Sequence, residues 1–182
     1  MVKSLEHPKP RAKRQELAVE AGLKARGIKF SRQVKHVWDP EGGYSRGSWG
    51  KGKDKGTKFC MLDLVIEKDD FTIVLEVDEH EHEGRKWWHE RDREQALIRT
   101  WRKDGGLAII RFNPDSYYVG DKLMTAEDLP QRLEKLCEYI ESMTCPGGFC
   151  RTVMYYSRDE GSEKARVARH WPEFWRRVTT YV

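Results

Sequence analysis

Two short apolar segments that carry acidic residues constrain the fold of this chain most strongly. Residues 61–66 read Met-Leu-Asp-Leu-Val-Ile, and residues 72–80 read Thr-Ile-Val-Leu-Glu-Val-Asp-Glu-His after a charged turn. Their composition predicts buried strands at about 58–66 and 71–78, joined as a hairpin. A carboxylate in such a strand is costly unless it is paired or coordinates a cation. The two strands are therefore expected to hold a functional site.

Three of these acids are expected to meet at one place. Glu76 and Asp78 are two residues apart, so their side chains leave the strand on the same face. Asp63 lies on the neighbouring strand, where the hairpin would bring it beside them. Three carboxylates in this arrangement form an oxygen-rich site suited to Mg²⁺ or Mn²⁺. The alternative is a surface hairpin whose acids face water and need no metal.

The distribution of charge points to a polyanionic partner. The formal net charge of the chain is +4, but it is unevenly distributed. Residues 1–58 carry 15 Lys or Arg and 6 Asp or Glu, whereas residues 59–182 carry 19 Lys or Arg and 24 Asp or Glu. Basic residues would neutralise phosphates, and the acidic residues would hold the cation. The alternative is a solvated surface with unevenly distributed charge.

Two segments are rich in basic residues and cannot build a core. Residues 1–10 form a basic arm with two prolines, and residues 39–57 are dominated by Gly, Ser, Lys and Arg. Tyr44 and Trp49 stand among these basic residues, which suits phosphate contacts combined with base stacking. The alternative for the second segment is a flexible linker. The residues expected to contact nucleic acid are Lys9, Arg11, Lys13, Arg14, Arg46, Lys51, Lys53, Lys55 and Lys86.

Hydrophobic periodicity predicts the remaining elements. Helices are expected at about 10–26, 85–103, 126–142 and 162–177, and further strands at about 28–37, 107–112 and 152–156. The core order is helix, strand, strand, strand, helix, strand. Antiparallel strands followed by a helical crossover give a mixed sheet in an α/β fold. We expect residues 1–182 to form one domain, because no linker to a second domain is visible.

The chain has no segment suited to a membrane. No apolar run approaches the roughly 20 residues that cross a bilayer, and the N-terminus lacks the apolar core of a signal peptide. We expect a soluble, intracellular protein with no membrane partner, in which the cysteines are reduced. Cys145 and Cys150 could form half of a structural zinc site that Cys137 or a His completes. Unligated thiols are the preferred interpretation.

The order of the elements and the placement of the acids resemble the PD-(D/E)XK nuclease superfamily. The stretch Leu-Glu-Val-Asp-Glu-His-Glu-His at residues 75–82 is similar to its very-short-patch-repair-like branch. The stretch from residues 90–93 to Gly105, followed by residues 109–112, resembles the charged helix, glycine break and arginine-bearing strand of that branch. The match covers residues 58–115. Two positions depart from the pattern: Asp78 replaces the usual lysine, and Glu81 stands where a glutamine is commoner.

The resemblance implies a restriction-endonuclease-like mixed sheet with the core order α-β-β-β-α-β and extra C-terminal helices. It also implies a Mg²⁺-dependent endonuclease that hydrolyses phosphodiester bonds in nucleic acid, with DNA favoured over RNA. By the same analogy, the protein would be a sequence- or structure-specific enzyme of the homing or repair kind that acts as a homodimer.

The resemblance also implies roles for individual residues. The expected metal ligands are Asp63, Glu76 and Asp78, with the Val77 carbonyl as a further oxygen. His82 would accept a proton or donate one to the phosphate, since its unperturbed pKa is about 6.5. The accessory candidates are His80 as an alternative to His82, Glu16 or Glu20 as a further carboxylate, and Arg111 as a contact to the scissile phosphate. Glu16 and Glu20 could instead form a solvated helix face, and Arg111 an ordinary ion pair.

Two other functions remain open at this point. The first is a nucleic-acid-binding protein that keeps the nuclease fold without catalysis. The second is a transition-metal site made by His80, Glu81, His82 and Asp78 for an oxygenase-like reaction. That second function needs a barrel of many short strands, and the long helix expected at 85–103 argues against it.

Overall fold

A computed structural model describes residues 12–38, 50–51, 58–79, 87–101, 105–125, 128–145, 148–156 and 179–181. The helices in these ranges are α1 (Ala12–Ala25), α2 (Trp87–Thr100) and α3 (Leu129–Ser142). The strands are β1 (Ser31–Trp38), β2 (Gly50–Lys51), β3 (Lys58–Glu67), β4 (Phe71–Val77), β5 (Gly106–Phe112), β6 (Tyr117–Val119), β7 (Lys122–Met124), β8 (Phe149–Met154) and β9 (Thr179–Tyr181).

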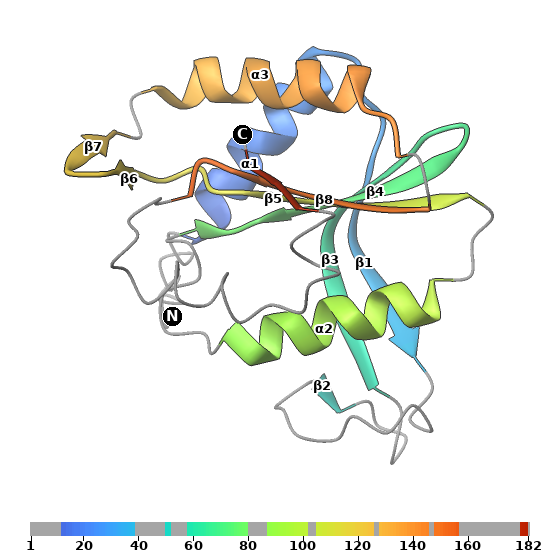
Figure 1. Ribbon diagram of the computed structural model, residues 1–182. Helices are drawn as coiled ribbons and strands as arrows, with labels where there is room; N and C mark the ends of the chain where they lie inside the picture. The colour runs from blue at the N-terminus through green and yellow to red at the C-terminus, as the bar shows by residue number, and fades with distance from the viewer. Residues whose placement is uncertain are drawn as a thin grey trace, which may run out of the picture.

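One mixed sheet organises the fold (Figure 1). Its strand order is β1-β3-β4-β5-β8-β9, and the short β2 pairs with β3 beside this path. β3 runs antiparallel to β1 and β4, whereas β4, β5, β8 and β9 are mutually parallel. The crossovers through α2 and α3 allow β4, β5 and β8 to pair in parallel. The predicted mixed α/β sheet is therefore confirmed.

Helices cover both faces of the sheet. α1 and α3 lie on one face and α2 on the other (Figure 1). The larger core cluster joins Val19 and Leu23 of α1 to Leu136 and Ile140 of α3 over the sheet. The second cluster packs Leu97 of α2 against the opposite face. Each strand of the sheet centre is therefore buried on both sides, and β4 and β5 are buried at every residue.

The alternation of side chains along β3 changes at Asp63. Leu62 packs in the cluster under α2, whereas Leu64, two residues later, packs in the cluster under α1 and α3. Regular alternation would place both on one face. Opposite Asp63 in β1, Gln33 has a left-handed backbone (φ 49°), and the β1–β3 register skips these two residues. The strand thus turns at Asp63.

The same turn separates β3 from β4. The two strands pair only between Leu64 and Glu67 on the β3 side. Beyond Asp63, β3 continues along β1, and β2 pairs with its residues Phe59 and Lys58. Asp63 therefore lies at the fork where β4 ends its pairing with β3.

Arg132 of α3 fixes the chain just after β5. Its guanidinium is buried and donates hydrogen bonds to the carbonyl oxygens of Asn113, Pro114 and Asp115. The aromatic ring of Tyr155 lies 5.3 Å from the guanidinium carbon. Arg132 thereby provides hydrogen-bond donors for three backbone carbonyls that lie beyond the end of β5.

The sequence-based boundaries differ from the structure in a few places. The predicted strand at 28–37 begins only at Ser31, and the predicted helix at 126–142 begins at Leu129 with Pro130 in its first turn. The β6–β7 hairpin was not predicted, because its strands have three residues each and bury little surface. The helix predicted at 162–177 lies outside the described residues. None of the helices in the described ranges is long and apolar enough to cross a bilayer.

A pair of alanine substitutions tests how closely β5 is held to the β3–β4 turn. A Cβ on Gly105 (φ +93°) would lie 2.2 Å from the carbonyl oxygen of Asp70, whereas a Cβ on Gly120 (φ +57°) would meet nothing within 4 Å. Both variants incur left-handed strain of about 1 kcal/mol. We expect Gly105→Ala to lose about 1–3 kcal/mol more than Gly120→Ala because of the clash. Urea unfolding measures both; equal losses would contradict the close approach.

Candidate active site

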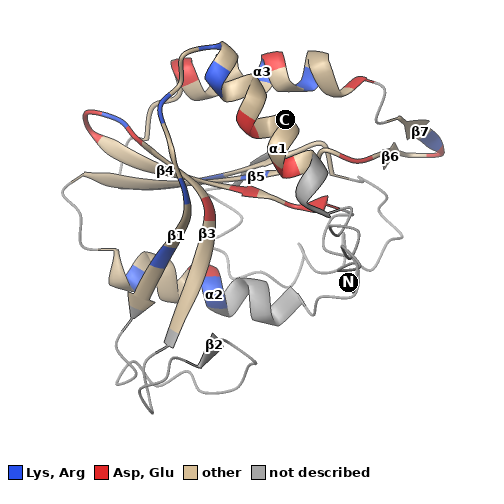
Figure 2. Ribbon diagram, turned by 180° about the vertical axis from the view of Figure 1, so that it is seen from behind, with Lys and Arg blue, Asp and Glu red and all other residues tan. Residues whose placement is uncertain are grey.

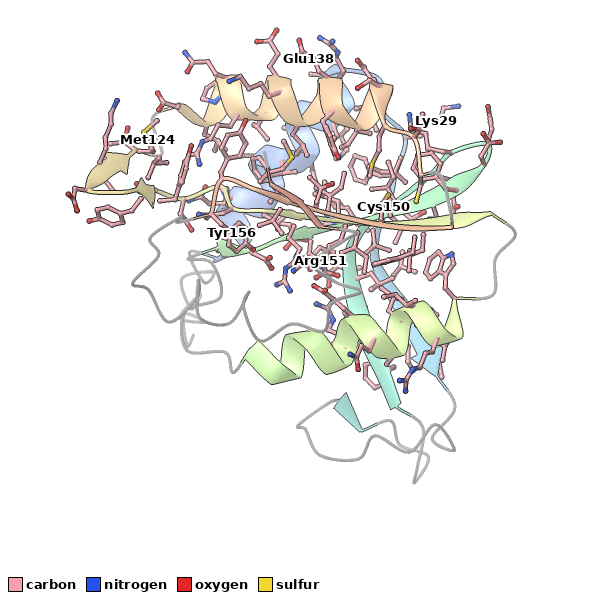
Figure 3. The ribbon with its side chains drawn as sticks, in the orientation of Figure 1. Lys29, Met124, Glu138, Cys150, Arg151 and Tyr156 are labelled. Atoms are coloured by element: carbon pink, nitrogen blue, oxygen red, sulfur yellow. The ribbon has the colours of Figure 1, made fainter. Side chains whose placement is uncertain are left out.

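Charged side chains gather where β4 ends and β3 turns away. They come from α1, β3, β4, α2, β5 and β8, so the site draws on every layer of the fold. Figure 2 marks in red the acidic residues of α1 and β3, and Figure 3 shows Arg151 on the side of the sheet that faces α2. The individual contacts divide into three groups.

The first group centres on Asp63. Its Oδ2 atom accepts a hydrogen bond of 3.0 Å from the amide of Val77, which lies beyond the paired part of β4. The Asp63 carboxylate thus accepts the hydrogen bond that a backbone carbonyl of β3 would accept if the two strands were still paired here. Burial raises the pKa of Asp63; the Val77 amide and Arg93 lower it, and the charges of Glu16 and Asp78 raise it.

The second group is the buried pair of Glu76 and Arg93. The Nη2 atom of Arg93 lies 2.6 Å from Glu76 Oε1 and also donates a 2.8 Å hydrogen bond to the Met61 carbonyl. Burial raises the pKa of Glu76 to about 7, and the negative charges of Asp63 and Asp78 act in the same direction. The Arg93 cation lowers this pKa, but it offsets only part of the rise.

The third group is a chain of alternating charges. Asp78, fully buried, accepts a hydrogen bond from the Nε atom of Arg111. Arg111 Nη1 lies 2.9 Å from Glu94 Oε1, and Arg151 Nε lies 2.9 Å from Glu94 Oε2. The hydroxyl of Tyr156 also donates to Asp78. Burial and the neighbouring Asp78 charge raise the pKa of Tyr156, which keeps this donor protonated.

The two glutamates of α1 have different surroundings. Glu16 is half-buried, accepts a 3.0 Å hydrogen bond from Gln33 and contributes negative charge at Asp63. Glu20 is 2% exposed and forms ion pairs with Arg32 (3.1 Å) and Lys24 (3.7 Å). Glu16 therefore belongs to the edge of the site, whereas Glu20 joins α1 to β1 and is not part of a solvated face.

The charges of Asp63 and Asp78 both act on Glu76, but Arg111 and Tyr156 engage the Asp78 carboxylate. Asp78 faces Arg111 and Tyr156, so its carboxylate serves the charge chain. Within the described ranges, no three Asp, Glu, His or Cys side chains are arranged to hold a metal ion. Asp63 and Glu76 would offer a divalent cation two carboxylates, because Asp63 adds negative charge at Glu76 and burial, the largest cause of both raised pKa values, makes uncompensated charge costly here.

Several predicted site residues fall in parts of the chain that the structure does not describe. His80, His82 and the basic residues Lys9, Arg11, Arg46, Lys53, Lys55 and Lys86 lie outside the described residues. The side chains of Lys13 and Arg14 in α1 and of Lys51 in β2 also lie outside the description. Arg111 is described: its side chain is 7% exposed, and its guanidinium contacts carboxylates on two sides.

Sequence reasoning missed four members of the site: Arg93, Glu94, Arg151 and Tyr156. A signal for Arg93 was present, because it precedes the core residue Leu97 by four positions and so shares its helix face. Glu94 similarly precedes Leu97 by three. No comparable pattern marks Arg151, since a basic residue in a short strand is usually assigned to the surface.

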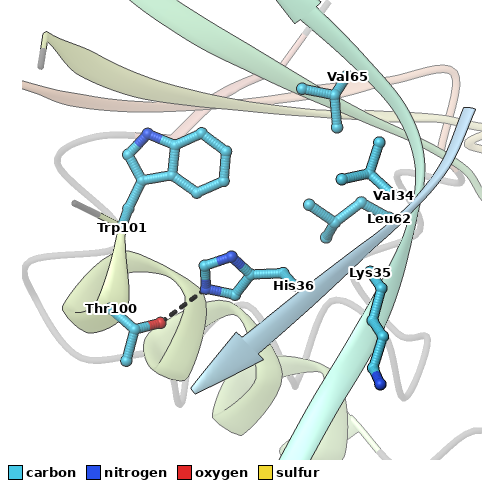
Figure 4. A pocket seen from close by; sticks show the side chains of 7 residues that line it. All are labelled: Val34, Lys35, His36, Leu62, Val65, Thr100 and Trp101. Atoms are coloured by element: carbon cyan, nitrogen blue, oxygen red, sulfur yellow. Dashed lines mark hydrogen bonds between the residues drawn. The ribbon is translucent and has the colours of Figure 1, made fainter. Parts of the chain in front are cut away.

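A shallow cavity of about 370 Å³ lies elsewhere, between β1, β3 and the end of α2. Val34, Leu62 and Trp101 line it, and His36 is hydrogen bonded to Thr100 at 2.8 Å while its ring stacks on Trp101 (Figure 4). None of the acids described above lines this cavity. The candidate active site is therefore defined by charged contacts and not by this cavity.

Comparisons of this chain with models of protein families, with curated proteins and with solved structures find no match. The functional argument therefore depends on the residues and their geometry.

The raised pKa of Glu76 predicts a pH-dependent stability. Its folded-state pKa of about 7 exceeds the usual 4.5, so the folded protein holds this proton longer than the unfolded chain. The free energy of unfolding should therefore fall as pH rises from about 4.5 to about 7, and Glu76→Gln should remove on the order of 3 kcal/mol of that fall. A smaller slope from Asp63 should remain. The measurement is urea unfolding with a chelator present.

The matched control for this pH series is Glu138→Gln, which changes an exposed glutamate on α3 (Figure 3). This variant should follow the wild-type pH dependence. Parallel curves for Glu76→Gln and wild type would show that Glu76 titrates normally in the folded state.

The charge chain predicts a second stability difference. Glu94→Gln removes the anion between the buried Arg111 and Arg151, which leaves two cations poorly compensated. We expect a loss of about 3 kcal/mol or more in the free energy of unfolding. Glu141→Gln removes a carboxylate that pairs with Arg26 on the exposed surface, and should change stability little. Similar losses in the two variants would refute a structural role for the chain of charges.

Proposed function

We propose that this protein is a Mg²⁺- or Mn²⁺-dependent endonuclease of the PD-(D/E)XK type, acting on nucleic acid and most readily on DNA. The observation that carries the proposal is the meeting of Asp63 and Glu76 at the fork between β3 and β4, with both carboxylates carrying raised pKa values. A metal-dependent nuclease needs such acids at the ends of strands, where the phosphate backbone of a nucleic acid can approach the bound metal ion.

The topology supports the same assignment. The core runs α1, β1, β3, β4, α2, β5, with the two-residue β2 inserted before β3. In the order β1-β3-β4-β5-β8, only β3 runs against its neighbours. The acids occupy the second and third of these strands, as the resemblance to this superfamily requires. Homodimer formation is proposed by the same analogy.

Each residue of the site would have a separate role in hydrolysis. Asp63 and Glu76 would hold the cation, which lowers the pKa of a bound water and neutralises charge that develops on the phosphate. Asp63 is oriented by the Val77 amide, and Arg93 holds Glu76 in place from α2. Asp78 acts as a positioning residue, because it fixes Arg111 and receives the Tyr156 hydroxyl. His82 is proposed to exchange the proton.

A second function has specific support. Glu76 and Asp78 are both engaged by arginines, and no three-ligand group occurs in the part of the chain that the structure describes. A nucleic-acid-binding protein that keeps the fold without catalysis would show this arrangement. Binding of a DNA duplex without any cleavage in Mg²⁺ or Mn²⁺ would establish this alternative.

The test of the proposed function compares Asp63→Asn and Glu76→Gln with wild type on plasmid and short-duplex DNA and on RNA. Each variant should lose more than about 100-fold in cleavage rate in Mg²⁺ because a cation ligand is removed. Duplex affinity measured in Ca²⁺ should change little, since phosphate contacts by basic residues dominate binding.

Glu138→Gln serves as the control, because it removes an acid from the exposed face of α3 and should cleave like wild type. Circular dichroism of each variant separates lost chemistry from lost folding. Undiminished cleavage by Asp63→Asn would remove this residue from the active site.

A further inference from the structure

Two thiols meet at the junction between α3 and β8. Cys145 follows α3, and Cys150 is the second residue of β8, at the end of that strand nearest the C-terminus of α3 (Figure 3). Their sulfur atoms are 2.8 Å apart, and both residues are half-buried. A covalent S–S bond is about 2.05 Å long, so the sulfurs need to close by only a short distance.

The main chain holds these thiols near one another. The connecting residues are Pro146, Gly147, Gly148 and Phe149, and Gly148 adopts a positive φ of 82°. The carbonyl of Gly148 accepts a 2.8 Å hydrogen bond from the amide of Leu107. Parallel pairing with β5 then places Cys150 opposite Ala108. The turn is therefore anchored to the central sheet on its β8 side.

Gly106 provides the space for this arrangement. A Cβ at this position would lie 3.2 Å from the Gly148 carbonyl oxygen and 3.4 Å from the sulfur of Cys145. The sulfur of Cys145 also lies 3.6 Å from the carbonyl oxygen of Leu107. The start of β5 thus fixes Cys145 as well as Cys150. A preorganised pair of this kind loses little conformational freedom when it is cross-linked.

We propose that Cys145 and Cys150 form a reversible intrachain disulfide, a redox modification site separate from the candidate active site. The oxidant is a low-molecular-weight disulfide such as oxidised glutathione. One protein thiolate attacks a sulfur of this disulfide and releases one small thiol, which leaves a mixed disulfide on the protein. The second protein thiolate then attacks the protein-bound sulfur and releases the second small thiol. The protein loses two hydrogens, and the oxidant is reduced to two thiols.

The environment favours this pair over the other two cysteines. Cys60 and Cys137 are buried, whereas Cys145 and Cys150 are half-buried and their sulfur atoms lie 2.8 Å apart. Within the pair, burial, and next the hydrogen bond to Cys145, raises the pKa of Cys150. We therefore assign the first attack to Cys145 and the closing attack to Cys150.

The cross-link would act on the charge chain through one peptide bond. Arg151 follows Cys150 directly and donates to Glu94, which also holds Arg111. A disulfide would tie the beginning of β8 to the end of α3 and so restrict the segment that carries Arg151. We expect the oxidised protein to unfold at a temperature about 5 °C higher than the reduced protein.

The experiment equilibrates the full chain with oxidised glutathione, then alkylates it in denaturant and digests it with trypsin. Cleavage after Lys135 and Arg151 gives one peptide, residues 136–151, that contains Cys137, Cys145 and Cys150. The oxidised peptide should carry a single alkyl group, on Cys137, and be two mass units lighter at the other two cysteines. Dithiothreitol should restore three alkyl groups.

Three variants make the test specific. Cys145→Ser and Cys150→Ser should each abolish the two-unit mass loss and the rise in melting temperature, whereas Cys137→Ser should retain both. Three alkyl groups after equilibration in the folded wild type, or a bridge that includes Cys137, would overturn the proposal. Stoichiometric zinc in the purified protein that is lost in both Cys145→Ser and Cys150→Ser would also overturn it, because the pair would then be a metal site.

Discussion

The fork between β3 and β4 is the constraint on which the rest of the site depends. β3 changes partners along one edge, from β4 on one side of Asp63 to β2 on the other. At the fork, the Val77 amide would lack an acceptor, and the Asp63 carboxylate provides it. In a regular β-ladder, a backbone carbonyl would accept the hydrogen bond of the Val77 amide, and no buried carboxylate would be needed at this position. The irregularity of the sheet is thus what brings carboxylates to the end of β4.

Among the described side chains around this fork, most of the buried carboxylates are paired with arginines. Asp78 and Glu94 are matched by Arg111 and Arg151, and Glu76 is matched by Arg93. Asp63 has a backbone amide as its hydrogen-bond partner and forms no ion pair within the described part of the chain. Among the described side chains, Glu16 adds further negative charge at Asp63. In the proposed nuclease, a cation held at Asp63 would offset this charge where the phosphate approaches.

Local sequence patterns predicted most of the scaffold. The alternation and apolar content of residues 58–78 identified β3 and β4, and the glycine at 105 separated α2 from β5. The proximity of Asp63 to Glu76 was also predicted, because a hairpin forces neighbouring strands together. The direction of Asp78 was not predictable in the same way. It depends on Arg111 and on Tyr156, which lies 78 positions further along the chain, and no local periodicity records such a distant partner.

The left-handed backbone of Gln33 also affects the exposed edge of the sheet. In the described part of the sheet, β1 is the outermost strand beside β3, and an unbroken outer strand offers a template on which another chain can add. The left-handed backbone at Gln33 interrupts that template midway along β1, and the exposed cations Arg32 and Lys35 flank the interruption. We therefore expect the irregularity opposite Asp63 also to hinder strand-to-strand association of concentrated protein.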